Sequence, residues 1–276
     1  MFDDLTLKTL DLRNKLDFEK QHLADTANIP WQELSERLNE LPARPARLNI
    51  IVSEIAQSSE IKVMLLKKGY EIAQSVDEST LLSFLENNKW LKRIGVQATN
   101  LWQPSNLISE FCKLNLVEVD GVSALDIGCG GGRDAVFLSK KGWQVTAIEK
   151  NPQVISRAKY LAEKNNQKID WLTCDVNDLS CLPDRKFNLI VIIRYLNRDL
   201  MDRIKQYIAP GTFLVFQAFS EGVQEFGSPK NPNFIVQLNE FAEKFGKSEA
   251  FEIIVDRIDT LEDGRPVSSF IARAVN

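Results

Sequence analysis

The sequence predicts an α/β fold in two parts, with a small N-terminal domain followed by a larger domain built on a parallel sheet. Two observations support this prediction. Short apolar runs, typical of buried strands, alternate along the chain with stretches whose apolar residues recur at helical spacing. Near the middle, residues 123–151 give a strand, a glycine turn, a helix, a second strand and an acidic residue. That order is typical of a nucleotide-binding unit.

The composition restricts the class of protein. The 276 residues are enough for one large domain or two modest ones, and 44% hydrophobic with 26% charged residues is ordinary for a globular protein. There is no apolar run of eighteen residues and the first residues are acidic, so we expect neither a membrane span nor a secretory signal. A net charge of −4 without a basic cluster argues against nucleic acid as the main partner. We therefore expect a soluble, cytoplasmic protein whose main partner is not nucleic acid.

The cysteines and histidine indicate no metal centre. The four cysteines show no CxxC spacing, and the chain has a single histidine, His22, which we interpret as structural. A zinc site or a disulfide framework is therefore not expected, and reduced thiols are the default for a cytoplasmic chain.

The first part of the chain alternates strands with helices. Residues 9–13, 48–52 and 70–73 have the apolar pattern of strands, and 17–22, 31–41 and 60–68 that of helices. Strands and helices in this order predict a small α/β domain.

Several short motifs in this part occur in the order found in a known family. They are Leu10-Asp11-Leu12-Arg13, then residues 17–23, then Ala27-Asn28-Ile29-Pro30, and later Lys67-Lys68-Gly69-Tyr70. Residues 1–90 thereby resemble a rhodanese-like domain. An active member carries a sulfur-bearing cysteine after the strand that matches 50–52, but Ser53 stands there, followed by Glu54. We predict that the domain has lost sulfur transfer and serves, at most, for a protein partner or self-association.

Residues 91–120 are expected to connect the two domains. Before them, residues 79–88 have a helical pattern with Ser79 as a candidate N-cap. Within them, the pattern of 105–114 predicts an amphipathic helix.

The glycine turn of residues 128–132 separates two classes of nucleotide-binding protein. A dinucleotide fingerprint needs glycines at its first, third and sixth places, and the sixth place here is Arg133. Asp126, two residues before the first glycine, would also repel a phosphate. An acid there suits a cation or a hydrogen-bond donor better.

The pattern Asp126-x-Gly128-x-Gly130-x-Gly132 resembles motif I of the class I S-adenosylmethionine-dependent methyltransferases. The resemblance implies a Rossmann-like seven-stranded sheet over 121–276, with S-adenosylmethionine as cofactor. It also implies that the glycine turn passes the methionine part of the cofactor, Glu149 binds the ribose hydroxyls, and Asp175 and Val176 bind the adenine. The cofactor-binding residues implied in this way are Asp126, Gly128, Cys129, Gly130, Gly132, Arg133, Glu149, Lys150, Asp175, Val176 and Trp102.

Two of these positions keep alternatives. Trp102 precedes a helix that covers the cofactor in related domains, or it packs in the core of the connecting segment. Arg133 binds the cofactor carboxylate or the substrate, or it forms a surface pair with Asp134.

The later elements complete the predicted sheet. Strands are expected at 169–174, 187–193 and 212–218, helices at 153–165, 200–208 and 233–245, and a closing antiparallel hairpin at 252–256 and 268–274. Binding is expected where the first four strands of this domain end.

The segments 130–136, 193–198 and 213–219 resemble the tellurite-resistance and thiopurine methyltransferase branch. The resemblance implies methyl transfer to a small molecule, with a thiol or other chalcogen nucleophile as acceptor, and places Arg194 and Tyr195 at the point of transfer. Arg265, in the closing hairpin, is read as structural, with contact to the active site as the alternative. Two other functions stay open: a non-catalytic cofactor-binding protein, and a protein methyltransferase recruited through the first domain.

Overall fold

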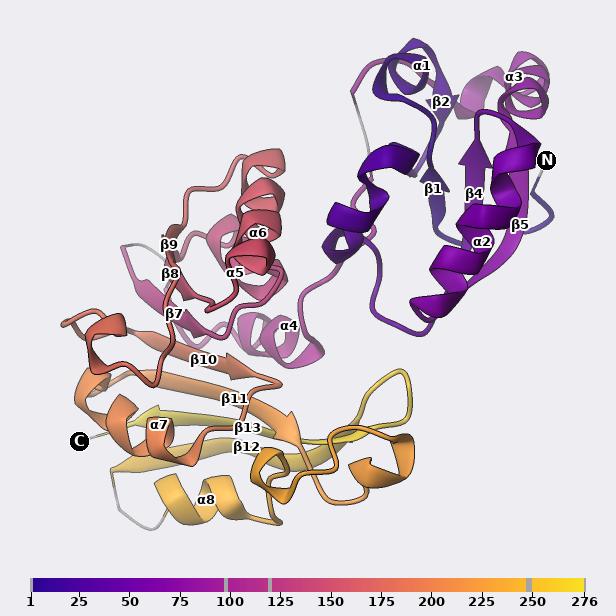
Figure 1. Cartoon of the computed structure of the whole chain (residues 1–276). Helices are drawn as coiled ribbons and strands as arrows, with labels where there is room; N and C mark the ends of the chain where they lie inside the picture. The colour runs from indigo at the N-terminus through magenta and orange to yellow at the C-terminus, as the bar shows by residue number, and fades with distance from the viewer. Residues whose placement is uncertain (1, 97–98, 119–120, 247–249, 276) are drawn as a thin grey trace. The chain divides into compact units, whose positions relative to one another are not determined.

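The computed structural model describes residues 2–96, 99–118, 121–246 and 250–275, and the chain divides into two compact units, Met1–Trp102 and Gln103–Asn276 (Figure 1). The expected connecting segment, 91–120, is thus divided between the two units. Among the described residues, no helix has the length and apolar character needed to cross a membrane.

The second unit is built on a seven-stranded sheet in the order β12-β13-β11-β10-β7-β8-β9. β13 runs antiparallel to both of its neighbours, and the other strand pairs are parallel. The closing hairpin therefore forms as the sequence predicts. The strands are β7 (Ser123–Ile127), β8 (Gln144–Ile148), β9 (Asp170–Leu172), β10 (Leu189–Ile193), β11 (Phe213–Phe219), β12 (Phe251–Thr260) and β13 (Pro266–Ala274).

Helices cover both faces of this sheet (Figure 1). Buried side chains of α4 and α5 pack on one face, and those of α7 and α8 pack on the other. This three-layer arrangement buries both faces of the central strands, which explains their continuous apolar sequences. The helices are α4 (Asn106–Lys113), α5 (Arg133–Lys140), α6 (Pro152–Lys164), α7 (Arg198–Arg203) and α8 (Glu240–Phe245).

The first unit contains a four-stranded parallel sheet in the order β3-β1-β4-β5 and a small antiparallel pair, β2 with β6. Separate apolar clusters cover its two faces, one beneath α2 and one beneath α3. The elements are β1 (Thr9–Asp11), α1 (Lys15–Lys20), β2 (His22–Leu23), β3 (Thr26–Asn28), β4 (Ala46–Val52), α2 (Ser58–Lys67), β5 (Tyr70–Asp77), α3 (Glu78–Asn87) and β6 (Lys92–Arg93).

Some local expectations are wrong. Residues 31–41 form two short 3₁₀ turns rather than one helix, since the spacing of three between Trp31 and Leu34 suits that tighter repeat. Asp77, not Ser79, caps α3, because its carboxylate accepts the Thr80 amide at 2.9 Å. Of the predicted helix 233–245, only α8 is an α-helix.

Candidate active site

The glycine turn is tied to the end of the neighbouring strand. The backbone amides of Gly128 and Cys129 both donate to the Ile148 carbonyl, at 2.9 and 3.0 Å. Gly128, Gly130 and Gly132 all have left-handed backbone angles, with φ of 73°, 53° and 78°. The turn therefore depends on glycine at all three positions.

The surroundings of these glycines differ. A Cβ at Gly132 would lie 2.7 Å from Ala158 Cβ, so this glycine allows α5 to pack against α6. A Cβ at Gly128 would lie 3.6 Å from the Tyr195 side chain. At Gly130 nothing lies within 4 Å, so this part of the turn is open to a ligand.

Asp126 is buried directly beneath the turn. Its side chain lies in the last part of β7, and its Oδ2 atom has no hydrogen-bond partner within the described structure. Burial raises the pKa of this carboxyl well above its usual range, and the nearby charge of Asp134 raises it further. A buried acceptor without a donor is costly, so the position favours a ligand that brings a donor or a positive charge.

Two more acids follow strands at the same edge of the sheet. Glu149 comes directly after β8, and its Oε1 accepts the Asn151 amide at 2.9 Å. Asp175 follows β9, and its Oδ1 accepts the backbone and side-chain nitrogens of Asn177 at 3.0 and 2.8 Å. The Lys150 ammonium lies 4.0 Å from Asp175, with both side chains exposed to solvent.

Val176 is buried, and its carbonyl accepts from Arg203 at 2.8 Å. Its position next to Asp175 gives an apolar wall beside an exposed carboxylate. This combination suits a flat heterocycle that has an amino group on its edge.

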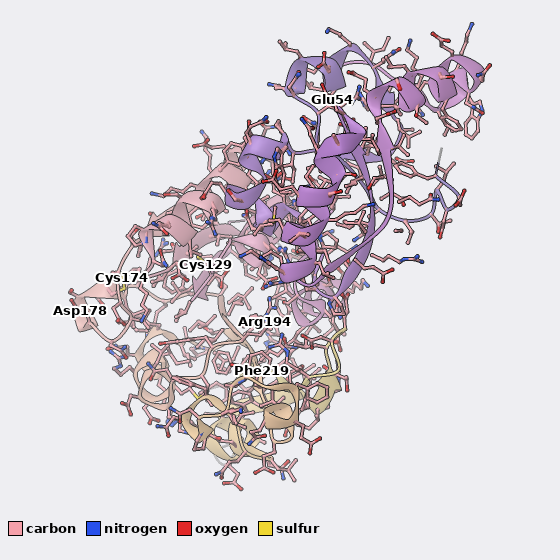
Figure 2. The ribbon with its side chains drawn as sticks, turned by 45° about the vertical axis from the view of Figure 1, so that its right-hand side comes forward. Glu54, Cys129, Cys174, Asp178, Arg194 and Phe219 are labelled. Atoms are coloured by element: carbon pink, nitrogen blue, oxygen red, sulfur yellow. A yellow bond between two sulfur atoms is a disulfide. The ribbon has the colours of Figure 1, made fainter. Side chains whose placement is uncertain are left out.

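Arg194 and Tyr195 follow β10. Arg194 has a φ of 57°, which is strained for a residue with a side chain, and its amide donates to the Gln217 carbonyl at 2.6 Å. Its guanidinium makes no hydrogen bond or ion pair with the described residues. Burial raises the pKa of Asp134, and the positive charge of Arg194 offsets part of that rise. Phe219, the last residue of β11, comes two residues after Gln217 and is labelled with Arg194 in Figure 2.

Tyr195 lies against the turn, with its ring beside Gly128 and its hydroxyl 3.2 Å from Asn197 Nδ2. Arg265, on the closing hairpin, lies 4.7 Å over the Phe219 ring and pairs with Asp263 at 2.7 Å. Aromatic and cationic side chains thus gather at the ends of β10 and β11.

The remaining predicted positions are placed as follows. Arg133 is the first residue of α5, directly after the turn. Cys129 is half-buried within the turn, and burial strongly raises the pKa of its thiol, which keeps it protonated. Trp102 is buried and is the last residue of the first unit, whereas all the other predicted site residues belong to the second.

Reasoning from the sequence missed two polar links. The Asn197 side chain donates to both Tyr195 and Asn177, so it joins the strand end at β10 to the loop after β9. The Asp134 carboxylate accepts the Ser105 amide at 2.6 Å, which ties the start of α4 to α5. Each link joins residues of different elements, and no local sequence pattern indicates such a contact, so neither link was predictable.

The expectation of four reduced cysteines is wrong. Cys174 and Cys181 form a disulfide, whereas Cys112 and Cys129 are free thiols. The two residues are seven apart in the sequence, and the fold of the loop between them brings their Cα atoms to 5.7 Å, a distance that a disulfide can span.

These features fit S-adenosylmethionine. The unpartnered Asp126 oxygen suits its ammonium group, the open space at Gly130 lets the ligand reach the backbone, and Glu149 suits its ribose hydroxyls. The Asp175–Val176 pair suits its adenine. All four features lie where parallel strands end, the usual place for a ligand in such a sheet.

Known proteins resemble this chain in sequence and in fold. A methyltransferase domain model matches residues 124–211. The chain is 25% identical to uncharacterized protein UNK4.09 of Schizosaccharomyces pombe, over 98% of this chain and 94% of that protein. It is 30% identical to the ubiquinone biosynthesis O-methyltransferase of Rickettsia typhi, over 37% of this chain and 39% of that enzyme.

The fold resembles that of TehB from Haemophilus influenzae, with a TM-score of 0.51 and 22% identity over 62% of each chain. The chain spans only about two fifths of the length of the Rickettsia enzyme, so that similarity concerns the methyltransferase domain and not the whole chain. The second unit is accordingly a class I S-adenosylmethionine-dependent methyltransferase domain, and S-adenosylmethionine is its cofactor.

Proposed function

We propose that this chain transfers the methyl group of S-adenosylmethionine to a small-molecule acceptor that carries a soft nucleophile, a thiol or another chalcogen. The observation that supports this most directly is the pairing of two uncompensated groups at one sheet edge. Among the described residues, the buried Asp126 oxygen has no donor, and the exposed Arg194 guanidinium has no acceptor. A cationic cofactor and an anionic acceptor would supply both.

In this proposal the cofactor residues divide by the part of the ligand they hold. Asp126 and the Gly128–Gly132 turn, with Cys129 in it, hold the methionine end, and Arg133 lies within reach of its carboxylate. Glu149 holds the ribose, with Lys150 beside it, and Asp175 with Val176 holds the adenine. The role of Trp102 in cofactor binding remains a prediction.

Arg194 and Tyr195 form the acceptor side. A residue held in the left-handed region costs about 1 kcal/mol, and such strain collects at functional sites. The Arg194 guanidinium forms no ion pair with the described residues, so it can bind a thiolate or another anion. Tyr195, fixed between Gly128 and Asn197, would set the position of the nucleophile.

The cofactor, when bound, supplies a methyl group already activated by the sulfonium. A thiolate acceptor then needs little acid–base assistance from the protein. The residues at the edge of the sheet therefore contribute alignment, charge and exclusion of water rather than proton transfer.

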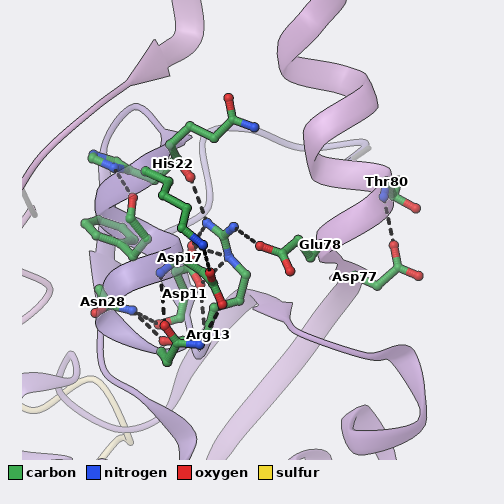
Figure 3. A network of polar contacts seen from close by, with 12 residues as sticks. Asp11, Arg13, Asp17, His22, Asn28, Asp77, Glu78 and Thr80 are labelled. Carbon is green, nitrogen blue, oxygen red and sulfur yellow. Dashed lines mark hydrogen bonds and ion pairs between the residues drawn. The ribbon is translucent and has the colours of Figure 1, made fainter.

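We propose further that the first unit is a rhodanese-like domain without sulfur transfer. Ser53 and Glu54 follow β4, where an active member needs a cysteine and loop donors. The one buried arginine at the carboxyl edge, Arg13, pairs with Asp11 at 2.7 Å and with Glu78 at 2.9 Å (Figure 3). Its charge is therefore neutralised and cannot stabilise a persulfide.

The test of the proposed function is titration calorimetry of the full chain with S-adenosylmethionine and its demethylated product. Asp126→Ala and Glu149→Ala should each weaken binding, whereas Glu163→Ala, an exposed acid on α6, should not. A screen for methylated products then begins with thiols, selenite and tellurite as acceptors. Binding without any product would favour a cofactor-sensing protein, and a product only on proteins would favour a protein methyltransferase recruited through the first unit.

A further inference from the structure

One pair of cysteines flanks the loop that we propose to hold the adenine. The Cys174–Cys181 disulfide closes the loop that carries Asp175 and Val176. Cys174 is half-buried at the end of β9, and Cys181 is buried beside Leu182 in the apolar core. Cys174 packs against the same core from its edge, so it is the less buried member of the pair.

The two free thiols have a different character. Burial raises the pKa of Cys112 to about 11 and also raises the pKa of Cys129, so both are protonated and poorly nucleophilic near neutral pH. Thiol–disulfide chemistry in the described part of the chain is therefore concentrated at the bonded pair.

Hydrogen bonds connect this loop to the acceptor side. Asn177, within the loop, accepts from Asn197 at 2.9 Å, and Asn197 also donates to the Tyr195 hydroxyl at 3.2 Å. The Arg203 guanidinium donates to the Val176 carbonyl at 2.8 Å. A change in the conformation of this loop would therefore move Asp175 and Val176 directly, and would move Tyr195 through the side-chain amide of Asn197.

We propose that Cys174 and Cys181 are a thiol–disulfide exchange site that sets the affinity for S-adenosylmethionine, high when the pair is oxidised and low when it is reduced. The inference depends on the proposed roles of Asp175 and Val176. The partner is a dithiol reductant, either a small molecule or a protein with two neighbouring thiols.

The exchange balances as follows. A thiolate of the dithiol attacks the sulfur of Cys174, the less buried cysteine, the bond between the two cysteines breaks, and Cys181 leaves as a thiolate that takes up a proton. The second thiol of the reductant then attacks the mixed disulfide and releases Cys174. Two electrons pass to the cysteine pair, and the dithiol becomes a disulfide.

Reduction should lower affinity because the freed loop gains conformations that cofactor binding must remove. A cross-link over so short a loop restricts the chain by a few kcal/mol at most, and the hydrogen bonds from Arg203 and Asn197 retain part of the order. We expect a loss of affinity of about tenfold on reduction.

The experiment is calorimetry of the full chain with S-adenosylmethionine and with its demethylated product, before and after treatment with dithiothreitol. Thiols counted in denaturant should rise from two to four on reduction. The double variant Cys174→Ser/Cys181→Ser should bind weakly in both conditions, and the control Cys112→Ser should respond like the wild type. Should the double variant not fold, reduced and alkylated wild-type chain replaces it.

The outcomes separate the two proposals. Equal affinity in both redox states, or four thiols in the untreated protein, would overturn the exchange site and leave the proposed function intact. Absence of cofactor binding in both states would overturn the proposed function instead.

Discussion

Two substitutions in the glycine turn separate its structural role from its binding role. Gly130→Ala and Gly132→Ala add the same methyl group at left-handed positions only two residues apart. At Gly132 the new Cβ would meet Ala158 Cβ at 2.7 Å and the Trp171 ring at 3.1 Å, whereas at Gly130 it would meet nothing within 4 Å.

The expected cost follows from these contacts. Each substitution costs about 1 kcal/mol because alanine disfavours the left-handed region. Forcing a methyl group against packed neighbours adds about 2 kcal/mol more at Gly132. We expect a loss in the free energy of unfolding of about 1 kcal/mol for Gly130→Ala and about 3 kcal/mol for Gly132→Ala.

Binding should respond in the opposite order. The methyl group of Gly130→Ala occupies space that is open to the cofactor, so its affinity for S-adenosylmethionine should fall by more than about tenfold while the fold persists. Urea unfolding and calorimetry measure the two effects. Equal destabilisation would refute the assigned packing of Gly132 on α6, and normal binding by Gly130→Ala would refute contact between the turn and the cofactor.

Three further substitutions test the site. Asp126→Asn removes a carboxyl whose pKa is raised in the folded state. The native wild type holds a proton there that the unfolded chain releases above a pH of about 4. The free energy of unfolding of the wild type therefore falls as pH rises toward the folded pKa. The variant should lose this decline, in unfolding curves from pH 4 to 8, and also lose cofactor affinity; a constant difference from wild type would contradict the raised pKa. Arg194→Gly should stabilise the chain by about 1 kcal/mol by removing left-handed strain, yet raise KM for an anionic acceptor, and an unchanged KM would remove Arg194 from the acceptor site. Asn197→Asp keeps the cap of α7 but loses both side-chain donors. Stability should therefore change by less than about 1 kcal/mol, while the affinity for the cofactor falls several-fold. Unchanged affinity would mean that the bonds of Asn197 to Asn177 and Tyr195 do not contribute to cofactor binding.

The order of elements in the second unit was predictable because buried parallel strands leave a strong signal. Val191 and Ile192 are buried on opposite faces of the sheet, so their strand is a continuous apolar run. Such a run predicts a buried strand without knowledge of distant residues. Glycines with left-handed angles are equally informative, because few other residues tolerate such a turn. The positions of Asp126 and Glu149 follow from the ends of those strands.

Contacts between side chains distant in sequence were not predictable. The bond of Asn197 to Asn177 depends on how α7 begins and on how the loop after β9 turns, and no local pattern encodes both. The left-handed Arg194 was hidden for a similar reason: its angle is imposed by the hydrogen bond of its amide to Gln217 on the neighbouring strand. The Cys174–Cys181 bond required knowing that one loop folds back on itself.

Charged groups at the carboxyl edges of the two sheets point to different roles for the two units. In the first unit Arg13 is wholly buried and bonded to Asp11, Glu78 and the Gln21 carbonyl, so folding alone compensates its charge (Figure 3). In the second unit, the Asp126 Oδ2 atom has no hydrogen-bond donor among the described residues. Arg194 has a strained, left-handed backbone, and its guanidinium has no ion-pair partner among those residues. Uncompensated burial and backbone strain lower stability, and they persist where a ligand uses them. By the same reasoning, the fully compensated charge of Arg13 indicates a structural role for that residue.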